Sequence, residues 1–282
     1  MKKITTIREM QKISNDLSRQ GNAIGFVPTM GYLHEGHMSL VDAAAEQCDT
    51  VVMSIFVNPL QFGEGEDFES YPRNAEGDRK LAEERGVDIL FIPDAEEMYP
   101  RPMTSIVKVK QGTDVLCGAS RPGHFDGVAT VVMKLFQAVR PSKAFFGQKD
   151  AQQVAVVSNM VEDYHLNIEI IPVPVKREKD GLAMSSRNVR LLKEERREAP
   201  LIYKTLIEAA EKIQSDKISD PVSEARSKLA GLSGTVDYLE LRTYPDLKEA
   251  DGTESGTLLL AAAVKYEQAR LIDNVMWNQQ KG

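Results

Sequence analysis

The sequence predicts an α/β protein with a Rossmann-like domain on a parallel sheet, followed by a smaller C-terminal α+β domain. Apolar runs such as residues 23–27 and 51–57 lack polar alternation, which is typical of strands covered on both faces. These runs alternate with segments of helical spacing, as in consecutive βαβ units. After residue 175, helices come first and strands later. We therefore expect domains over residues 1–175 and 176–282.

Helices and strands alternate within the first domain. Thr6 and Glu9 have the spacing of a capping box before the apolar stripe of a first helix, which Gly21 ends. The expected elements are a helix at 7–19, a strand at 23–27, a helix through 40–48, a strand at 51–57, a turn at 58–63, a helix from Asn74 to about 85, a strand at 87–92, a short strand at 105–109, a loop over 114–127, a helix at 128–139, a strand at 143–146, a helix at 152–161 and a strand at 168–173.

The second domain begins with a charged turn over residues 176–181. A charged helix is expected from about Leu191, and Pro200 should interrupt it because proline lacks the N–H that the helical ladder needs. The remaining expected elements are a helix to about Gln214, a helix that starts at Ser219-Asp220-Pro221 and ends by Gly231, and strands at 236–242, 257–264 and 270–275.

Composition excludes several classes of protein. The 282 residues are 42 % hydrophobic, enough for a core, and the net charge of −7 without a basic stripe argues against a nucleic-acid partner. No apolar run reaches the roughly 18 residues that span a bilayer, and the N-terminus lacks the apolar region of a signal peptide. Two cysteines, Cys48 and Cys117, are too few for a disulfide framework, so we expect structural roles for them and a reducing, cytoplasmic location.

The strongest functional signal lies in residues 25–40. His34 and His37 fall at the start of a predicted helix, and side chains three apart address the same object. Gly31 and Gly36 let a ligand approach the backbone, and the free N–H groups of a helix N-terminus favour a phosphate. Two histidines alone also fit a structural role or a metal pair.

Other polar clusters follow the predicted strands at their carboxyl ends, where parallel sheets bind ligands. They are residues 29–37, Asn58 with Gln61, residues 147–150, and Lys176. Met184-Ser185-Ser186-Arg187 adds hydroxyls, backbone amides and a guanidinium fork suited to phosphate oxygens. Neither a Walker lysine loop nor a G-x-G-x-x-G turn is present, so the two histidines and the Ser-Ser-Arg segment are expected to form two halves of a phosphate clamp.

Four stretches, taken together and in order, resemble the pantothenate synthetase (pantoate–β-alanine ligase) family of the HIGH-motif nucleotidyltransferase superfamily. They are Pro28-Thr29-Met30-Gly31 with Leu33-His34-Glu35-Gly36-His37, Val57-Asn58-Pro59 with Gln61-Phe62-Gly63, Gly147-Gln148-Lys149-Asp150 with Gln152-Gln153, and Asp180-Gly181-Leu182-Ala183-Met184-Ser185-Ser186-Arg187-Asn188. The His-x-Gly-His element alone is weak evidence, because several adenylylating families share it.

The resemblance implies a two-step, ATP-dependent ligation. The carboxylate of pantoate attacks the α-phosphorus of ATP with Mg²⁺ on the phosphates, and pyrophosphate leaves. The amine of β-alanine then attacks the pantoyl adenylate, which gives pantothenate and AMP. Such transfer depends on positioning and charge stabilisation more than on a protein nucleophile. The resemblance also implies a homodimer whose partners are small-molecule substrates, without nucleic acid or membrane.

The same resemblance assigns roles to individual residues. The catalytic residues are His34, His37, Lys149, Ser185, Ser186 and Arg187, with His37 as proton donor. ATP contacts are expected from Met30, Gly31, Tyr32, Leu33, His34, Glu35, Gly36, His37, Gly147, Gln148, Lys149, Asp150, Lys176, Met184, Ser185, Ser186 and Arg187. Pantoate and β-alanine are expected to contact Gln61, Gln153, Asn58 and Tyr71, and no metal ligand is assigned to the protein.

Other interpretations stay open from the sequence. A nucleotidyltransferase that releases a nucleotidylated product would share the two histidines but would not need Gln61 and Gln153. A non-catalytic module would bind ATP without releasing pyrophosphate. Asn58 also fits a plain turn before Pro59, and Met30 fits a core position. We assign structural roles to His124 and His165.

Overall fold

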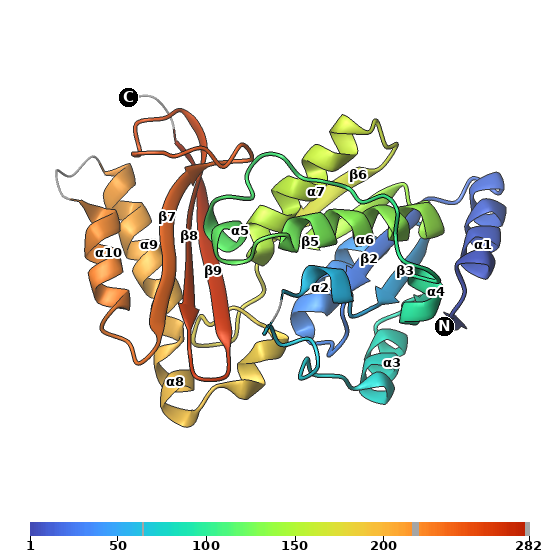
Figure 1. Ribbon diagram of the computed structural model, residues 1–282, viewed down its shortest axis with the longest axis horizontal. Coiled ribbons are helices and arrows are strands. Elements are labelled where there is room, and N and C mark those ends of the chain that lie inside the picture. Colours follow the sequence, from blue (N-terminus) through green and yellow to red (C-terminus); the bar gives the residue numbers. More distant parts are fainter. Residues whose placement is uncertain (64, 216–219, 280–282) are drawn as a thin grey trace. The chain divides into compact units, whose positions relative to one another are not determined.

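The computed structural model describes residues 1–63, 65–215 and 220–279, which form two compact units (Figure 1). The first unit comprises Met1–Lys110, Pro122–Gln148 and Val156–Pro174. The second comprises Gln111–Arg121, Lys149–Ala155 and Val175–Gly282. Ser219, expected to open a helix, lies outside the described residues.

Strands and helices alternate in the first unit, so the predicted α/β class is confirmed. Its elements are β1 (Lys2–Ile4), α1 (Ile7–Arg19), β2 (Ile24–Thr29), α2 (Glu35–Ala45), β3 (Thr50–Ile55), the 3-10 turn η1 (Pro59–Gln61), α3 (Ala75–Glu84), β4 (Ile89–Phe91), α4 (Ala95–Met98), α6 (His124–Val139), β5 (Lys143–Gly147), most of α7 (Ala151–Asp163) and β6 (Glu169–Val173).

The sheet of the first unit is parallel throughout, with strand order β1-β4-β3-β2-β5-β6. From β2 the chain winds outward to β3 and β4 on one side, and later to β5 and β6 on the other. The winding therefore reverses between β2 and β5, whose carboxyl ends are Thr29 and Gly147. Doubly wound sheets bind ligands outside the strand ends at such a reversal.

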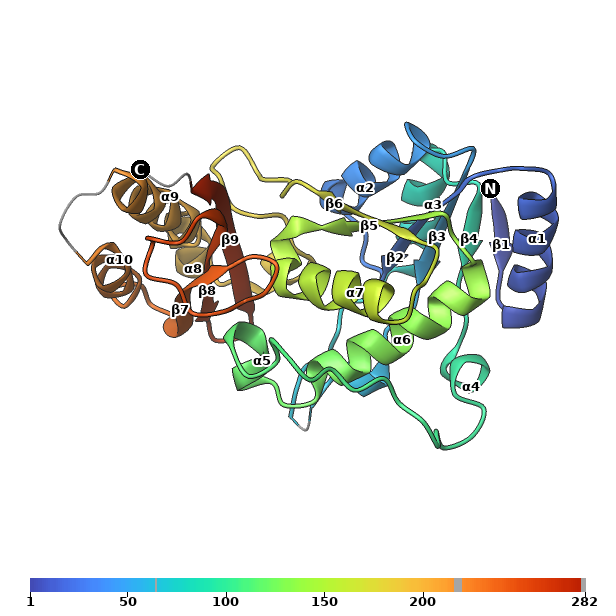
Figure 2. The same cartoon turned by 90° about the horizontal axis from the view of Figure 1, so that it is seen from above.

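Helices cover both faces of this sheet, and Figure 2 shows α2 and α6 on opposite sides of it. Phe26 of β2 is fully buried and meets Phe136 of α6 edge-on, with ring centroids 6.3 Å apart. Its neighbour Val27 points to the other face, where it packs in a cluster with Met38 and Val41 of α2. Alternate residues of β2 thus face opposite apolar layers, which is why the sequence of this strand is an unbroken apolar run.

The second unit has the α+β class that the sequence predicts. It also contains Gln111–Arg121 and Lys149–Ala155, which the expected boundary at residue 175 assigned to the first domain. Its elements are α5 (Leu116–Ser120), the 3-10 turns η2 (Gln148–Asp150, which begins in the first unit) and η3 (Ser186–Arg190), α8 (Lys193–Glu198), α9 (Pro200–Gln214), α10 (Pro221–Leu229), β7 (Thr235–Thr243), β8 (Gly256–Lys265) and β9 (Arg270–Gln279). The three strands form an antiparallel sheet in the order β7-β8-β9.

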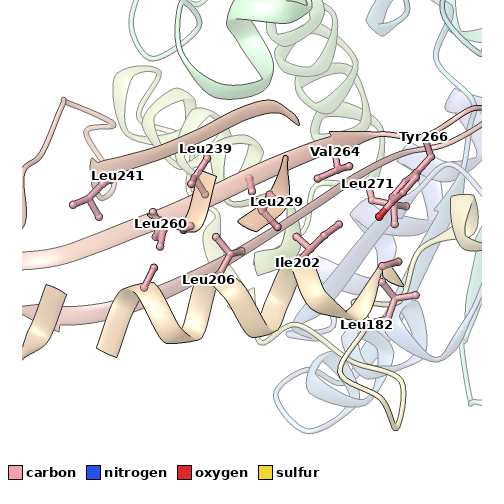
Figure 3. Packing of buried hydrophobic residues seen from close by; sticks show 14 of the residues in the cluster. Leu182, Ile202, Leu206, Leu229, Leu239, Leu241, Leu260, Val264, Tyr266 and Leu271 are labelled. Carbon is pink, nitrogen blue, oxygen red and sulfur yellow. The ribbon is translucent and has the colours of Figure 1, made fainter. Parts of the chain in front are cut away.

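One apolar cluster holds helix and sheet of the second unit together. Ile202 and Leu206 project from α9 toward the strands, where Leu239 and Leu260 meet them (Figure 3). All four side chains are at most 2 % exposed. Full burial of each is worth about 1.5–3 kcal/mol, so this contact fixes the helix on the sheet.

Several expected elements differ from the structure. Residues 105–109 form no strand. Side chains of α6 take their N–H groups instead: Val107 donates to Thr130 Oγ1 (3.0 Å) and Val109 to Asp126 Oδ1 (2.8 Å). The expected loop over 114–127 contains α5 and the first turn of α6. Gly123 precedes α6 without any capping side chain, so the usual start signal is missing.

Candidate active site

The loop after β2 has an unusual backbone conformation. Gly31 and Tyr32 both have positive φ, 86° and 51°, and a tyrosine in that region is strained. The buried carboxylate of Asp78 accepts the N–H of Tyr32 (2.9 Å) and the N–H of Leu33 (2.7 Å). A side chain on residue 31 would lie 3.0 Å from that carboxylate. The loop is therefore held by Asp78 of α3.

This loop delivers His34 and His37 to the first turn of α2. His34 is the N-cap residue: its Nδ1 accepts the N–H of Gly36 (3.1 Å), and its own N–H is donated to His37 Nδ1 (3.3 Å). The two imidazole centroids are 4.0 Å apart. A nitrogen that accepts a hydrogen bond carries no proton, so the proton of each neutral ring sits on Nε2. The helix start therefore presents two ring N–H donors beside its own positive end.

Asn58 and Gln61 lie in a buried polar network of the first unit. The amide of Asn58 donates to Gln61 Oε1 (3.2 Å) and to the carbonyl of Gly127 (3.1 Å), while its oxygen accepts Tyr99 O–H (2.7 Å). Burial raises the pKa of Tyr99, which keeps this phenol a donor. The amide nitrogen of Gln61 contacts Met30 Sδ at 2.9 Å. Three residues expected at the site, Met30, Asn58 and Gln61, are thus brought together.

His124 and Tyr71 contact residues in and next to η1. His124 Nδ1 donates to the carbonyl of Gln61 (2.7 Å), so this histidine orients η1, in line with a structural role. Tyr71 is buried and packs edge-on against Phe62, with ring centroids 6.0 Å apart.

A hairpin of the second unit carries Lys176 and Met184. The N–H of Met184 donates to the carbonyl of Lys176 (3.0 Å), and Arg177 and Ala183 form the next bridge. The N–H of Glu178 closes the turn on Leu182 (2.8 Å). The hairpin places the exposed Lys176 directly opposite Met184.

The Ser-Ser-Arg segment follows this hairpin and forms η3. Ser185 Oγ accepts the N–H of Arg187 (3.2 Å), and Ser186 is buried. Asn188 ties the segment back by donating to Ala183 O (3.0 Å) and Glu178 Oε1 (3.1 Å). These contacts fix the path of the segment from Ser185 to Asn188.

Lys149 belongs to the second unit and lines a small hollow there with Ser185, Asn188 and Asp273. Its ammonium lies 3.4 Å from the carboxylate of Asp150. The structure therefore brings together Lys149 and the Ser-Ser-Arg segment.

Gln153 is half-buried in the first turn of α7. Its neighbour Gln152 is buried and structural: its amide donates to the carbonyls of Gly112 (2.7 Å) and Val115 (2.8 Å) and accepts the N–H of Cys117 (2.9 Å).

Sequence reasoning missed three residues that shape these groups: Asp78, Tyr99 and Asp273. Each acts on a partner far away in the chain, such as Leu33 for Asp78 and Arg177 for Asp273. No local spacing reveals a contact of that kind.

Within residues 1–63, 65–215 and 220–279, the structure holds no cluster of three or more His, Cys, Asp or Glu side chains arranged for a metal ion. Over the same residues, no helix has both the length and the apolar character needed to cross a membrane.

Comparisons with a family model and with curated proteins point to the same family. The model of the Pantoate-beta-alanine ligase family matches residues 2–276. The pantothenate synthetase of Halalkalibacterium halodurans is 54 % identical over 275 residues, which covers 96 % of this chain and 97 % of that protein. That of Bacillus subtilis is 51 % identical over 279 residues, 98 % of this chain and 97 % of that protein.

Solved structures agree with the sequence comparison. The pantothenate synthetase of Thermus thermophilus superposes with a TM-score of 0.91 at 44 % identity and covers 98 % of this chain and 99 % of that one. The Francisella tularensis pantoate–β-alanine ligase was solved with beta-gamma ATP and β-alanine. It superposes with a TM-score of 0.78 at 34 % identity and covers 100 % of this chain and 99 % of that one. By fold, by sequence and by the motifs around His34 and His37, this chain belongs to the pantoate–β-alanine ligase family of enzymes.

Proposed function

We propose that this chain is an ATP-dependent ligase that condenses pantoate with β-alanine through a pantoyl adenylate, releasing pyrophosphate and AMP. Family membership supports the overall reaction. The observation that carries the proposal is the histidine pair. Both Nδ1 atoms accept backbone N–H groups, so both Nε2–H groups would serve as donors at the start of α2. Two donors beside a helix N-terminus suit the phosphates of a nucleotide.

In the first step, a carboxylate oxygen of pantoate forms a bond to the α-phosphorus, and the bond to pyrophosphate breaks. Negative charge grows on the phosphate oxygens, so donors fixed in advance lower the barrier most. His34 and His37 would donate to these oxygens, with His37 as proton donor. Lys149, Lys176 and Arg187 would neutralise their charge, and Ser185 and Ser186 would add hydroxyl and amide donors.

Binding of the nucleotide would use the backbone around the histidines. Met30, Gly31, Tyr32, Leu33, Glu35 and Gly36 belong to the loop and first turn of α2, whose path Asp78 restrains. Gly147, Gln148 and Met184 would add backbone or apolar contacts. Asp150 would accept a ribose hydroxyl.

In the second step, the amine of β-alanine attacks the acyl carbon, AMP leaves with the oxygen that linked it to the acyl group, and the amine gives up a proton to form the amide. Gln61 and Gln153 suit the hydroxyl and carboxylate of pantoate because an amide both donates and accepts. Asn58 would hold Gln61 in place through their hydrogen bond, and Tyr71 would close the apolar side of the pocket.

We also infer that ATP reacts as its magnesium complex, since Mg²⁺ is commonly held by substrate phosphates with only one or two protein carboxylates.

The sequence resemblance favours a homodimer, and the composition favours a cytoplasmic location. Equilibrium sedimentation would test the dimer.

Isotope exchange tests the function directly. The enzyme should exchange labelled pyrophosphate into ATP when pantoate is present and β-alanine is absent, because adenylation is reversible on the enzyme. AMP should accumulate only when β-alanine is added as well. Exchange that needs no pantoate, or a nucleotidylated product that leaves the enzyme, would instead indicate a nucleotidyltransferase. ATP binding without any pyrophosphate chemistry would indicate a binding module.

A further inference from the structure

A buried ion pair lies behind the hairpin of the second unit. The guanidinium of Arg177 meets the carboxylate of Asp273 through two parallel hydrogen bonds, Nη1 to Oδ2 at 2.6 Å and Nη2 to Oδ1 at 2.9 Å. The side chains are 16 % and 5 % exposed. Two-pronged pairing of this kind fixes orientation as well as distance.

Arg177 is also held on its other sides. Its Nη1 donates to the carbonyl of Gly181 at the hairpin turn (3.1 Å), and its guanidinium carbon lies 3.2 Å from the ring centroid of Tyr203 on α9. The hairpin that presents Lys176 and Met184 is therefore fastened to both β9 and α9 through one side chain.

The next residue of β9 holds a second proposed ATP-binding segment. Asn274 donates from Nδ2 to the backbone carbonyl of Lys149 (3.0 Å), and its own N–H donates to Asp273 Oδ1 (2.8 Å). Asn274 is 5 % exposed. Of these two adjacent residues of β9, Asp273 therefore holds the hairpin through Arg177, and Asn274 holds the backbone of Lys149.

Stability alone is a weak reason for this arrangement. The pair lies next to the apolar cluster that contains Leu182 and Leu271, where hydrophobic side chains would fill the same volume. Replacing a buried ion pair by hydrophobic residues of similar size is commonly neutral or stabilising, because desolvation offsets the attraction between the charges. What the ion pair adds is a defined geometry between two chain segments.

We propose that Arg177, Asp273 and Asn274 are positioning residues for the adenylation step, and that they fix the hairpin and its Ser-Ser-Arg segment relative to Lys149. This inference rests on the proposed function. None of the three is assigned contact with a substrate. They act through the residues proposed to bind phosphate, where small misplacement is costly.

The main test replaces the pair by an apolar one, Arg177→Met together with Asp273→Leu. The double variant leaves no charge unpaired, although the N–H of Asn274 loses its acceptor, so its thermal midpoint should fall by no more than about ten degrees. Its kcat for pantoate-dependent pyrophosphate exchange should nevertheless fall about 10- to 100-fold, with a smaller change in the KM for pantoate. A double variant that is stable and keeps the parent's exchange rate would overturn the proposal.

A second variant keeps the test decisive if the double variant does not fold. Asn274→Ala removes only the bond to the Lys149 carbonyl and should lower kcat by about tenfold. In a Lys149→Ala background the same change should lower it no further, because the residue that it positions is already gone. If the two losses simply multiply, Asn274 is a structural residue and the proposal fails.

The parent enzyme and a matched control run beside these variants. Glu208→Gln breaks an exposed ion pair with Lys228 on the same unit and should leave exchange unchanged. A parent that shows no pantoate-dependent exchange would refute the proposed function, and this inference with it. An active parent with fully active variants refutes the positioning role alone.

Discussion

At the residue scale, the orientation of His34 and His37 depends on backbone groups. Each Nδ1 accepts a main-chain N–H, which favours one tautomer and one orientation of each ring. A donor fixed in this way is reorganised little when charge develops on a phosphate, which is the condition for transition-state stabilisation.

Replacing His37 with alanine should therefore impair the adenylation step strongly. We expect a loss of about 3–4 kcal/mol, the usual value for a transition-state donor, measured as the rate of pantoate-dependent pyrophosphate exchange. A fall of less than about tenfold, or about 1.4 kcal/mol, would contradict the role. His165→Asn is the control: His165 has a φ of 51°, which asparagine tolerates, and its replacement should not change exchange.

Asp78 should matter for the same step without touching substrate. Its carboxylate accepts two successive N–H groups, and Asp78→Asn would turn an amide donor toward one of them. We expect kcat to fall about 10- to 100-fold with little change in fold, read by steady-state kinetics and circular dichroism. Asp88→Asn is the control. The Asp88 carboxylate accepts the N–H of Val51 (2.8 Å) near the amino end of β3, away from the loop that carries the histidines. Equal losses in both variants would point to general destabilisation.

At the element scale, helix α6 lies so close to η1 that only glycine fits between them. A Cβ on residue 127 would stand 2.1 Å from the carbonyl oxygen of Leu60 and 2.8 Å from Gln61 Cα. The contact also includes the hydrogen bond from Asn58 to the carbonyl of Gly127. The position of η1, and with it the amide of Gln61, is thus set by α6.

Gly127→Ala should consequently raise the KM for pantoate and lower stability by about 1–3 kcal/mol, the usual cost of overpacking. Steady-state kinetics and urea unfolding measure the two effects. Gly63→Ala serves as the matched change, because a Cβ there meets nothing closer than 3.8 Å. A Gly127→Ala enzyme with the parent's KM would show that η1 does not determine pantoate binding.

The elements also show what sequence patterns can and cannot predict. Helix α1 was predictable to the residue, since Thr6 caps it and its apolar stripe is regular. Pro200 begins α9 as its first residue, which the missing N–H explains. Strand β1 has only three residues at the sheet edge, and α4 has four, too few to show a period.

Some residues of the candidate site could be predicted from local sequence, and others could not. His34, Gln61 and Ser185 belong to short motifs that can be recognised in the sequence. Asp78 and Asp273 are visible only in the fold, because their partners lie 45 and 96 residues away. Polar residues that orient others from a distance carry no local signature, so the fold has to be known before they can be found.

At the scale of the whole molecule, acid stability should depend on a charged cluster of the second unit. Burial alone would raise the pKa of Asp237, but hydrogen bonds from Lys265 and Arg270 outweigh it, and the pKa lies below its ordinary value. The two bonds measure 2.8 and 2.7 Å. A lowered folded pKa means that the unfolded chain binds more protons in acid, so this stabilisation is complete above about pH 5 and is lost as pH falls through the folded value.

Asp237→Asn should therefore be less stable than the parent at pH 7, and the gap should shrink as the pH falls below about 4. Urea unfolding at several pH values measures it. A gap that stays constant down to about pH 2 would show that the charge of Asp237 does not stabilise the fold.

The pairing of β2 with both β3 and β5 has a kinetic consequence. Gly25 is registered with Val51 on one side and with Lys143 on the other, so the central strand needs a partner that comes more than a hundred residues later. Closing so long a loop costs entropy before any contact offsets it, and topologies with such distant contacts fold slowly. During refolding, affinity for nucleotide should therefore return only when β5 has paired with β2, later than the first gain of helical signal.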